Sequence, residues 1–288
     1  MNVRFRVSRR SVTVAAALVG VVSLAIGAHA ALNKRTPDAA KAVASEQVSD
    51  ASPNASRIAL VIGNGHYPDA SAPLAQPIND ARALTAALRH NGFEVDVVED
   101  ASKDDMHRAI GRMKSKIRPD SVVMLFFGGY GVQVGRESYM IPVDAAIWKE
   151  ADVRRDGFSV EQVLATMKEQ GARAKLVVID ASRRNPYERR FRTFSHGLAP
   201  IAAPDNALIL SSATPGKVAD DSSGANSVLM AELLSNINAQ PAGAAGAEAV
   251  FNKTRIAISR ASDGEQVPAV SSTLLEDVSF ATTDKAGG

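Results

Sequence analysis

Two hydrophobic patterns alternate along the chain. Short continuous apolar runs are typical of strands covered on both faces of a parallel sheet. These runs are residues 58–62, 122–127, 176–179 and 208–210, and residues 93–98 are predicted as a further strand. Between them, apolar residues recur every three or four positions, as on one face of a helix. These helical stretches are residues 78–90, 102–117, 159–171, 228–237 and 247–258. Alternating strands and helices predict one doubly wound α/β domain, which we assign to residues 57–281.

Polar residues at the start of two helical stretches support this assignment. Ser102 with Asp105 has the spacing of a capping box, and Ser159 stands three residues before Gln162. A serine at this position accepts a hydrogen bond from a backbone N–H that the first turn leaves unpaired. We therefore expect helices to begin immediately after Ser102 and Ser159.

The N-terminus has the pattern of an export signal. Four arginines precede an apolar run at residues 12–27, which ends in Ala28-His29-Ala30. A basic head, an apolar middle and small residues at the end predict a signal peptide over residues 1–30, cleaved after Ala30. The protein would then be periplasmic or secreted. If the segment is not cleaved, residues 11–30 would anchor the chain in the inner membrane, because the apolar run is close to the ~18–20 residues that a span needs.

The two segments that flank the predicted domain lack hydrophobic periodicity. Residues 31–56 are rich in Ala, Ser, Asp and Pro, a composition that predicts a flexible linker. Residues 282–288 are expected to form a disordered tail. Neither segment carries enough apolar side chains to add to the core.

Charge and cysteine content exclude several classes of function. Four of the 33 Lys and Arg residues lie in the signal, which leaves 29 against 31 Asp and Glu. The basic balance thus belongs to the signal, and we expect no nucleic-acid partner. The chain contains no cysteine, which excludes disulfides, thiolate metal sites and a cysteine nucleophile. Phosphate-loop, dinucleotide and zinc motifs are also missing, so we expect neither a cofactor nor a metal.

Ligands of parallel sheets bind beyond the carboxyl ends of the strands. This rule selects three turns, at residues 63–67, 128–131 and 180–183. If the third and fourth strands are neighbours, Tyr130 and Ser182 face each other across one cleft.

Several blocks of sequence around these turns resemble the bacterial caspase-like peptidases, which are orthocaspase and metacaspase relatives of caspases. The blocks are RIALVIGN (57–64), PINDARAL (77–84), FFGGYGVQVGRESYMIPVDA (126–145), VVIDASRRNP (177–186), GLAP (197–200) and ATPG (213–216). The resemblance implies a caspase-type, parallel-rich sheet flanked by helices. It also implies a catalytic His–Cys dyad, with the His after the third strand and the Cys after the fourth.

The chain departs from the family at both catalytic positions, which hold Tyr130 and Ser182. They are 52 positions apart, close to the caspase-like His–Cys spacing of about 50. The family's thiolate chemistry cannot occur without a cysteine. The resemblance further implies an oxyanion site made by backbone amides near Gly129 and Ser182.

Ser182 could instead act as a serine nucleophile if a nearby base took its proton. An unperturbed phenol with a pKa of about 10 makes Tyr130 a poor base. His66, after the first strand, and His196, in the loop after Ser182, are the candidate replacements. Without such a base, Ser182 is a hydroxyl that stabilises a turn.

Asp180 is retained two residues before the nucleophile position. In metacaspase-like relatives the Asp at this place binds a basic side chain by a charge-assisted pair, so a pocket for Arg or Lys is implied here. Asp220 and its neighbour Asp221 could supplement it. The alternative is that Asp180 only accepts hydrogen bonds from backbone amides at the end of its strand.

A basic loop follows Ser182 directly. Its arginines are Arg183, Arg184, Arg189, Arg190 and Arg192. They could form a solvated surface loop, a site for an acidic partner, or an intramolecular plug that offers an arginine to Asp180.

We therefore expect an exported caspase-fold pseudopeptidase that binds or regulates through a pocket for basic side chains. Its partner would be a peptide or protein with such side chains, or an active caspase-like relative. Membrane contact would arise only through an uncleaved N-terminus. An active endopeptidase with Ser182 as nucleophile and a purely structural module are the competing hypotheses.

Overall fold

The computed structural model describes residues 56–68, 73–183, 187, 197–219, 224–239 and 246–280. Several sequence-based expectations fall outside these residues. They concern the signal at 1–30, nearly all of the linker, the tail at 282–288, and the side chains of His196, Asp220 and Asp221.

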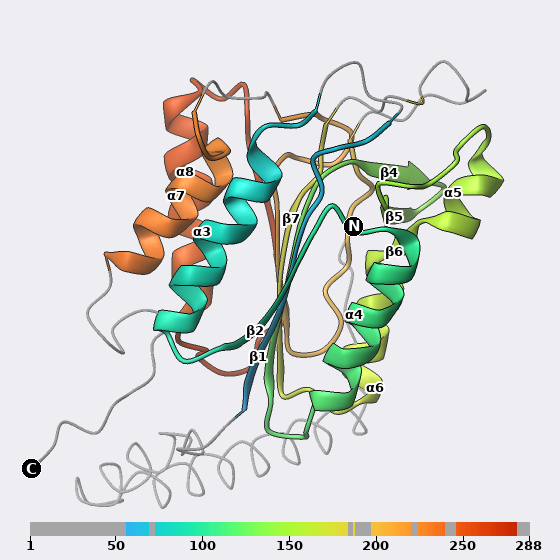
Figure 1. The fold of residues 1–288 in the computed structure, drawn as a ribbon. Coiled ribbons are helices and arrows are strands. Elements are labelled where there is room, and N and C mark those ends of the chain that lie inside the picture. Colours follow the sequence, from blue (N-terminus) through green and yellow to red (C-terminus); the bar gives the residue numbers. More distant parts are fainter. Residues whose placement is uncertain are drawn as a thin grey trace, which may run out of the picture. The chain divides into compact units, whose positions relative to one another are not determined.

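A six-stranded sheet, in the order β2-β1-β3-β7-β8-β9, forms the centre of the fold (Figure 1). Its strands are β1 (Arg57–Gly63), β2 (Glu94–Glu99), β3 (Val122–Gly128), β7 (Ala174–Asp180), β8 (Ala207–Ser211) and β9 (Ala269–Ser272). The first five pair in parallel, and β9 pairs antiparallel with β8. Each of the five segments predicted as strands corresponds to one of the parallel strands, extended or shifted by one or two residues.

Helices cover both faces of this sheet (Figure 1). Their bounds are α3 (Gln76–His90), α4 (Lys103–Lys116), α5 (Glu150–Asp156), α6 (Val160–Glu169), α7 (Val228–Asn238) and α8 (Ala247–Ala261). One core cluster joins the sheet to α3, α7 and α8, and a second joins its other face to α4 and α6. Side chains alternate along a strand, so successive residues of β7 enter different clusters. No helix in the described part of the chain is long and apolar enough to cross a membrane.

Both predicted caps are present. The Ser102 hydroxyl accepts a hydrogen bond from the Asp105 N–H, and the Asp105 carboxylate accepts one from the Ser102 N–H, which completes a capping box for α4. The Ser159 hydroxyl accepts from the Gln162 N–H at the start of α6.

A second, three-stranded sheet was not predicted from the sequence. Its strands are β4 (Gly131–Val134), β5 (Glu137–Met140) and β6 (Phe158–Ser159), in the order β4-β5-β6 and all antiparallel. This sheet starts one residue after Tyr130. It therefore extends directly from the turn that follows β3.

The register of β3 and β7 fixes the geometry of the candidate site. Gly128, the last residue of β3, is aligned with Asp180, the last residue of β7. Tyr130 and Ser182 each follow two residues later, so they lie at the same end of two adjacent parallel strands. The expectation that the third and fourth predicted strands are neighbours is confirmed.

Candidate functional site

Ser182 is held by its backbone, and its hydroxyl is enclosed. The Ser182 N–H donates to the Ser212 hydroxyl at 3.4 Å, and the Ser182 carbonyl accepts from the Ala219 N–H at 2.6 Å. Only 1% of Ser182 is exposed, and its Oγ makes no hydrogen bond within the described part of the structure. No base is therefore in hydrogen-bond contact with this hydroxyl there.

Tyr130 packs against a second buried tyrosine. The rings of Tyr130 and Tyr67 meet edge to face, with centroids 4.7 Å apart. The Tyr67 hydroxyl accepts the Tyr130 N–H at 3.1 Å and donates to the Ile141 carbonyl at 2.9 Å. Burial raises the pKa of Tyr67 far above its usual value, so this phenol stays protonated. The pair therefore provides aromatic packing and neutral hydrogen bonds.

Gly129 lies where a side chain would collide with Tyr67. Its φ is +155°, and a Cβ built there would lie 2.5 Å from the Tyr67 hydroxyl oxygen. Its N–H donates to the Asp180 carbonyl at 3.3 Å, and the Gly131 N–H donates to the Ala181 carbonyl at 3.0 Å. The implied oxyanion role of Gly129 stays a prediction. For this role the Gly129 N–H would have to break its hydrogen bond to the Asp180 carbonyl.

A second buried carboxylate, which sequence reasoning missed, interacts electrostatically with Asp180. Asp180 is 2% exposed and Asp80, on α3, is 0% exposed. Burial, and then the charge of Asp180, raises the pKa of Asp80 to about 6. One Asp80 oxygen accepts the Asn226 side-chain amide at 2.8 Å and the Ser227 N–H at 3.0 Å. The other oxygen has no hydrogen-bond partner among the described residues.

The sequence contained a weak signal for Asp80. It lies one turn before Leu84 and two turns before Leu88, on the apolar stripe of its helix. A carboxylate on the buried face of a helix is uncommon and indicates a partner or a function.

Arg183 brings a positive charge to this acidic end of the sheet. It is 5% exposed, and its Nη2 lies 3.8 Å from Oδ2 of Asp180. This separation gives an ion pair without a direct hydrogen bond. Its charge also acts on the Tyr67 hydroxyl, so the guanidinium is close to both groups. The other arginines of the basic loop lie outside the described residues.

His66 is directed to another carboxylate. Its Nδ1 lies 2.6 Å from Oδ2 of Asp100, at the end of β2. Partial burial of Asp100 acts to raise its pKa, but the N–H groups of His66 and Gly65 and the imidazole together hold the pKa below its usual value. The imidazole thus points toward β2, which is separated from β7 by β1 and β3. His90 and His107 are exposed on helices, as expected.

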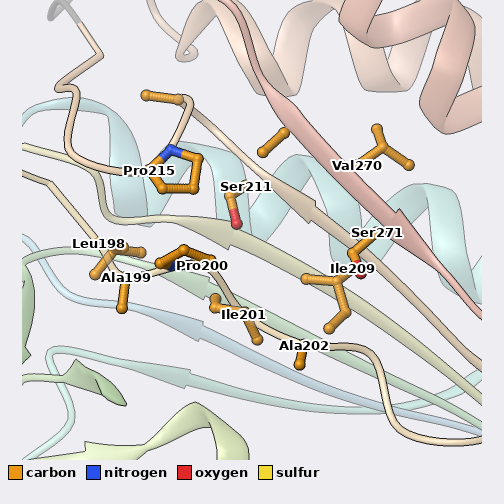
Figure 2. Close-up of a pocket in the computed structure, with 12 residues that line it drawn as sticks. Leu198, Ala199, Pro200, Ile201, Ala202, Ile209, Ser211, Pro215, Val270 and Ser271 are labelled. Atoms are coloured by element: carbon orange, nitrogen blue, oxygen red, sulfur yellow. The ribbon is translucent and has the colours of Figure 1, made fainter. Parts of the chain in front are cut away.

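An apolar pocket of about 330 Å³ lies near the site, but on the other face of the sheet (Figure 2). Residues 198–202 line it together with Ile209 and Ser211 of β8 and Val270 of β9. Ile209 belongs to the cluster under α4 and α6. Asp180 has the same orientation as Val178, which packs toward α3. A side chain bound at Asp180 would therefore not occupy this pocket.

Within the described ranges, no three His, Asp or Glu side chains gather closely enough to bind a metal ion.

Comparisons with known proteins show the family and the fold. The family model described as "Caspase domain" matches residues 56–279. Mucosa-associated lymphoid tissue lymphoma translocation protein 1 of Homo sapiens is 27% identical over 144 residues, which are 50% of this chain and 17% of that protein. Its Mus musculus homolog is 28% identical over 133 residues, 46% of this chain and 16% of that protein. The chain thus spans about a sixth of the length of these curated relatives.

A solved structure has the same fold. The crystal structure of caspase-1 from Spodoptera frugiperda matches with a TM-score of 0.61 and 15% identity, over 81% of this chain and 95% of that chain. The predicted caspase-type α/β fold is confirmed.

Proposed function

Because the chain belongs to the caspase-domain family, as its sequence blocks predicted, we propose that it is an exported pseudopeptidase that binds basic side chains without cleaving the peptide. In this proposal Tyr130 and Ser182 occupy the positions of the family's His and Cys. Asp180 supplies the charge that attracts the ligand.

The observation that carries this proposal is that the Ser182 hydroxyl has no hydrogen bond to a base among the described residues. A hydroxyl becomes a useful nucleophile only when an adjacent base removes its proton. In the described part of the chain no side chain accepts a hydrogen bond from Ser182, and His66 is paired with Asp100. Removing the base or nucleophile of a protease costs about 10⁶-fold in turnover. We therefore expect no measurable cleavage.

A preference for basic side chains is supported by the two carboxylates. Asp80 and Asp180 are both buried, and each has one oxygen without a hydrogen bond in the described residues. Buried carboxylates are costly unless paired, so a guanidinium or ammonium group is the complementary ligand. The partner in this proposal is a peptide or protein with an exposed Arg or Lys, such as a caspase-like relative.

A turnover assay tests the loss of chemistry. Purified protein is incubated with fluorogenic peptides that end in Arg or Lys, next to Ser182→Ala and the double variant Tyr130→His with Ser182→Cys. We expect the native protein and Ser182→Ala to be silent and the double variant to cleave. Cleavage by the native protein that Ser182→Ala abolishes would establish Ser182 as a nucleophile and refute the proposal.

A binding assay tests the pocket separately. A labelled peptide ending in Arg amide is compared with one ending in citrulline, which has nearly the same shape without the charge. Native protein should prefer the Arg peptide, and Asp180→Asn should remove the preference. Equal binding of both peptides to native protein would favour a structural module without a ligand.

A further inference from the structure

We infer that Arg183 is the resident cation at the buried carboxylates Asp80 and Asp180, and that a basic ligand side chain binds at Asp180 only when Arg183 moves away. This inference rests on the proposed function, because it concerns the same pocket. In this inference a side chain of the protein itself competes with the ligand for Asp180.

The position of Arg183 supports this role. Arginine is almost never fully buried in a protein unless it is paired. Only 5% of Arg183 is exposed, and its Nη2 lies 3.8 Å from Oδ2 of Asp180. Asp180 is the same carboxylate that would receive a ligand. The guanidinium therefore occupies the surroundings that an incoming Arg or Lys would need.

The local backbone ties Arg183 to the turn at the end of β7. Its N–H donates to the Ala181 carbonyl at 2.9 Å, while the carbonyl of the preceding Ser182 accepts from Ala219. The side chain thus starts within one residue of Ser182 and returns toward Asp180, three residues back. Such a short connection gives the internal cation a high effective concentration relative to a ligand in solution.

The ion pair between Arg183 and Asp180 is weak enough for a ligand to replace Arg183. A separation of 3.8 Å exceeds hydrogen-bond distance, and Oδ2 of Asp180 has no hydrogen-bond partner in the described part of the chain. A ligand guanidinium could form the two parallel hydrogen bonds that this carboxylate does not make with Arg183. Two guanidinium groups at Asp180 would repel each other, so in this inference the ligand replaces Arg183.

A peptide-binding series on the full chain tests the competition. The probe is a fluorescein-labelled peptide ending in Arg amide, with the citrulline peptide as control, measured by fluorescence anisotropy. The proteins are native, Arg183→Met, which keeps much of the bulk without charge, and Arg183→Lys, which keeps the charge. We expect Arg183→Met to bind the Arg peptide at least tenfold more tightly than native protein does. Arg183→Lys should stay within threefold of native.

The outcomes separate this inference from the proposed function. If native protein prefers the Arg peptide but Arg183→Met binds it no more tightly, Arg183 is not a competitor, and the pocket itself stands. If neither protein distinguishes the Arg peptide from citrulline, the proposed function fails and the inference fails with it.

A rescue experiment remains decisive if Arg183→Met folds poorly. Arg183→Ala leaves a space of the size of a guanidinium beside Asp180. Methylguanidinium can enter this space and restore the positive charge. Methylurea is neutral and cannot restore it. Millimolar methylguanidinium should raise the Tm of Arg183→Ala but leave that of native protein unchanged. Equal shifts in both proteins, or none in Arg183→Ala, would overturn the inference.

Discussion

Replacing Asp80 by asparagine should change how the stability of the protein depends on pH. Asp80 is buried, and burial together with the charge of Asp180 raises the pKa of its carboxyl to about 6. In an unfolded chain an Asp carboxyl has a pKa of about 3.9. Between these two values, the folded protein holds the proton while the unfolded chain has released it.

The size of the effect follows from this difference in pKa. About two units, at about 1.4 kcal/mol each, correspond to about 3 kcal/mol of stability. Below pH ~4 Asp80 is protonated in both states, and there is no penalty. As the pH rises toward ~6, only the unfolded chain gains by ionising, so the free energy of unfolding falls. Above pH ~6 the loss is complete.

Urea unfolding of native protein and Asp80→Asn at pH 4, 5, 6 and 7.5 measures this contribution. The asparagine keeps an oxygen that can accept from Asn226 and Ser227, and it has no proton to lose. The difference in unfolding free energy, variant minus native, should therefore rise by about 3 kcal/mol between pH 4 and pH 7.5. A constant cost of burying the new amide group cancels in this comparison.

The same pair of measurements in an Asp180→Asn background separates the two causes. Without the charge at position 180, only burial remains to raise the pKa of Asp80, so the rise should be smaller. If native protein and Asp80→Asn give parallel stability curves from pH 4 to pH 7.5, the folded and unfolded pKa values of Asp80 do not differ. The electrostatic reasoning for this end of the sheet would then be wrong.

Four further substitutions test the local structure at the site and on α4, each by thermal unfolding. Tyr67→Phe removes the acceptor of the buried Tyr130 N–H and one of the two donors to the Ile141 carbonyl, which keeps the hydrogen bond from Asn64 Nδ2, so it should cost about 1–3 kcal/mol; no measurable loss would contradict these hydrogen bonds. Gly197→Ala puts a Cβ 2.0 Å from the Lys217 carbonyl oxygen at φ +66°, whereas Gly216→Ala meets nothing within 4 Å at φ +77°. The first should therefore cost at least about 2 kcal/mol more than the second, and equal losses would refute the close contact. Gly111→Ala, in open space on α4, should instead raise Tm by about 2–4 °C, and a lower Tm would contradict its helical position.

Most of the central sheet was predictable because its inner strands β1, β3, β7 and β8 are buried on both faces. Every residue of β3 and β7 is buried, so these strands read as uninterrupted apolar runs. The smaller sheet gives no such signal. Its strands have only two to four residues and are interrupted by Gln133 and Glu137, so neither alternation nor a continuous run is long enough to detect. The edge strand β9 is equally short and only partly buried.

The sequence predicted only those residues of the candidate site that follow the ends of strands. Tyr130 and Ser182 come directly after buried strands, so the parallel topology alone brought them together. Asp80 could not be placed in this way, because it reaches Asp180 through the packing of α3 on the sheet. Arg183 was one of five equivalent arginines in the sequence. The turn after β7 directs its side chain back to Asp180, which the sequence could not show.

The direction of the strands also separates the candidate site from the start of the described chain. Ser56 precedes β1, and its carbonyl accepts the N–H of Val122, the first residue of β3. Ser182 follows the end of β7, which runs parallel to β3, so a strand length of about 20 Å lies between the two ends. The chain before residue 56 thus joins the domain at the end away from Tyr130 and Ser182.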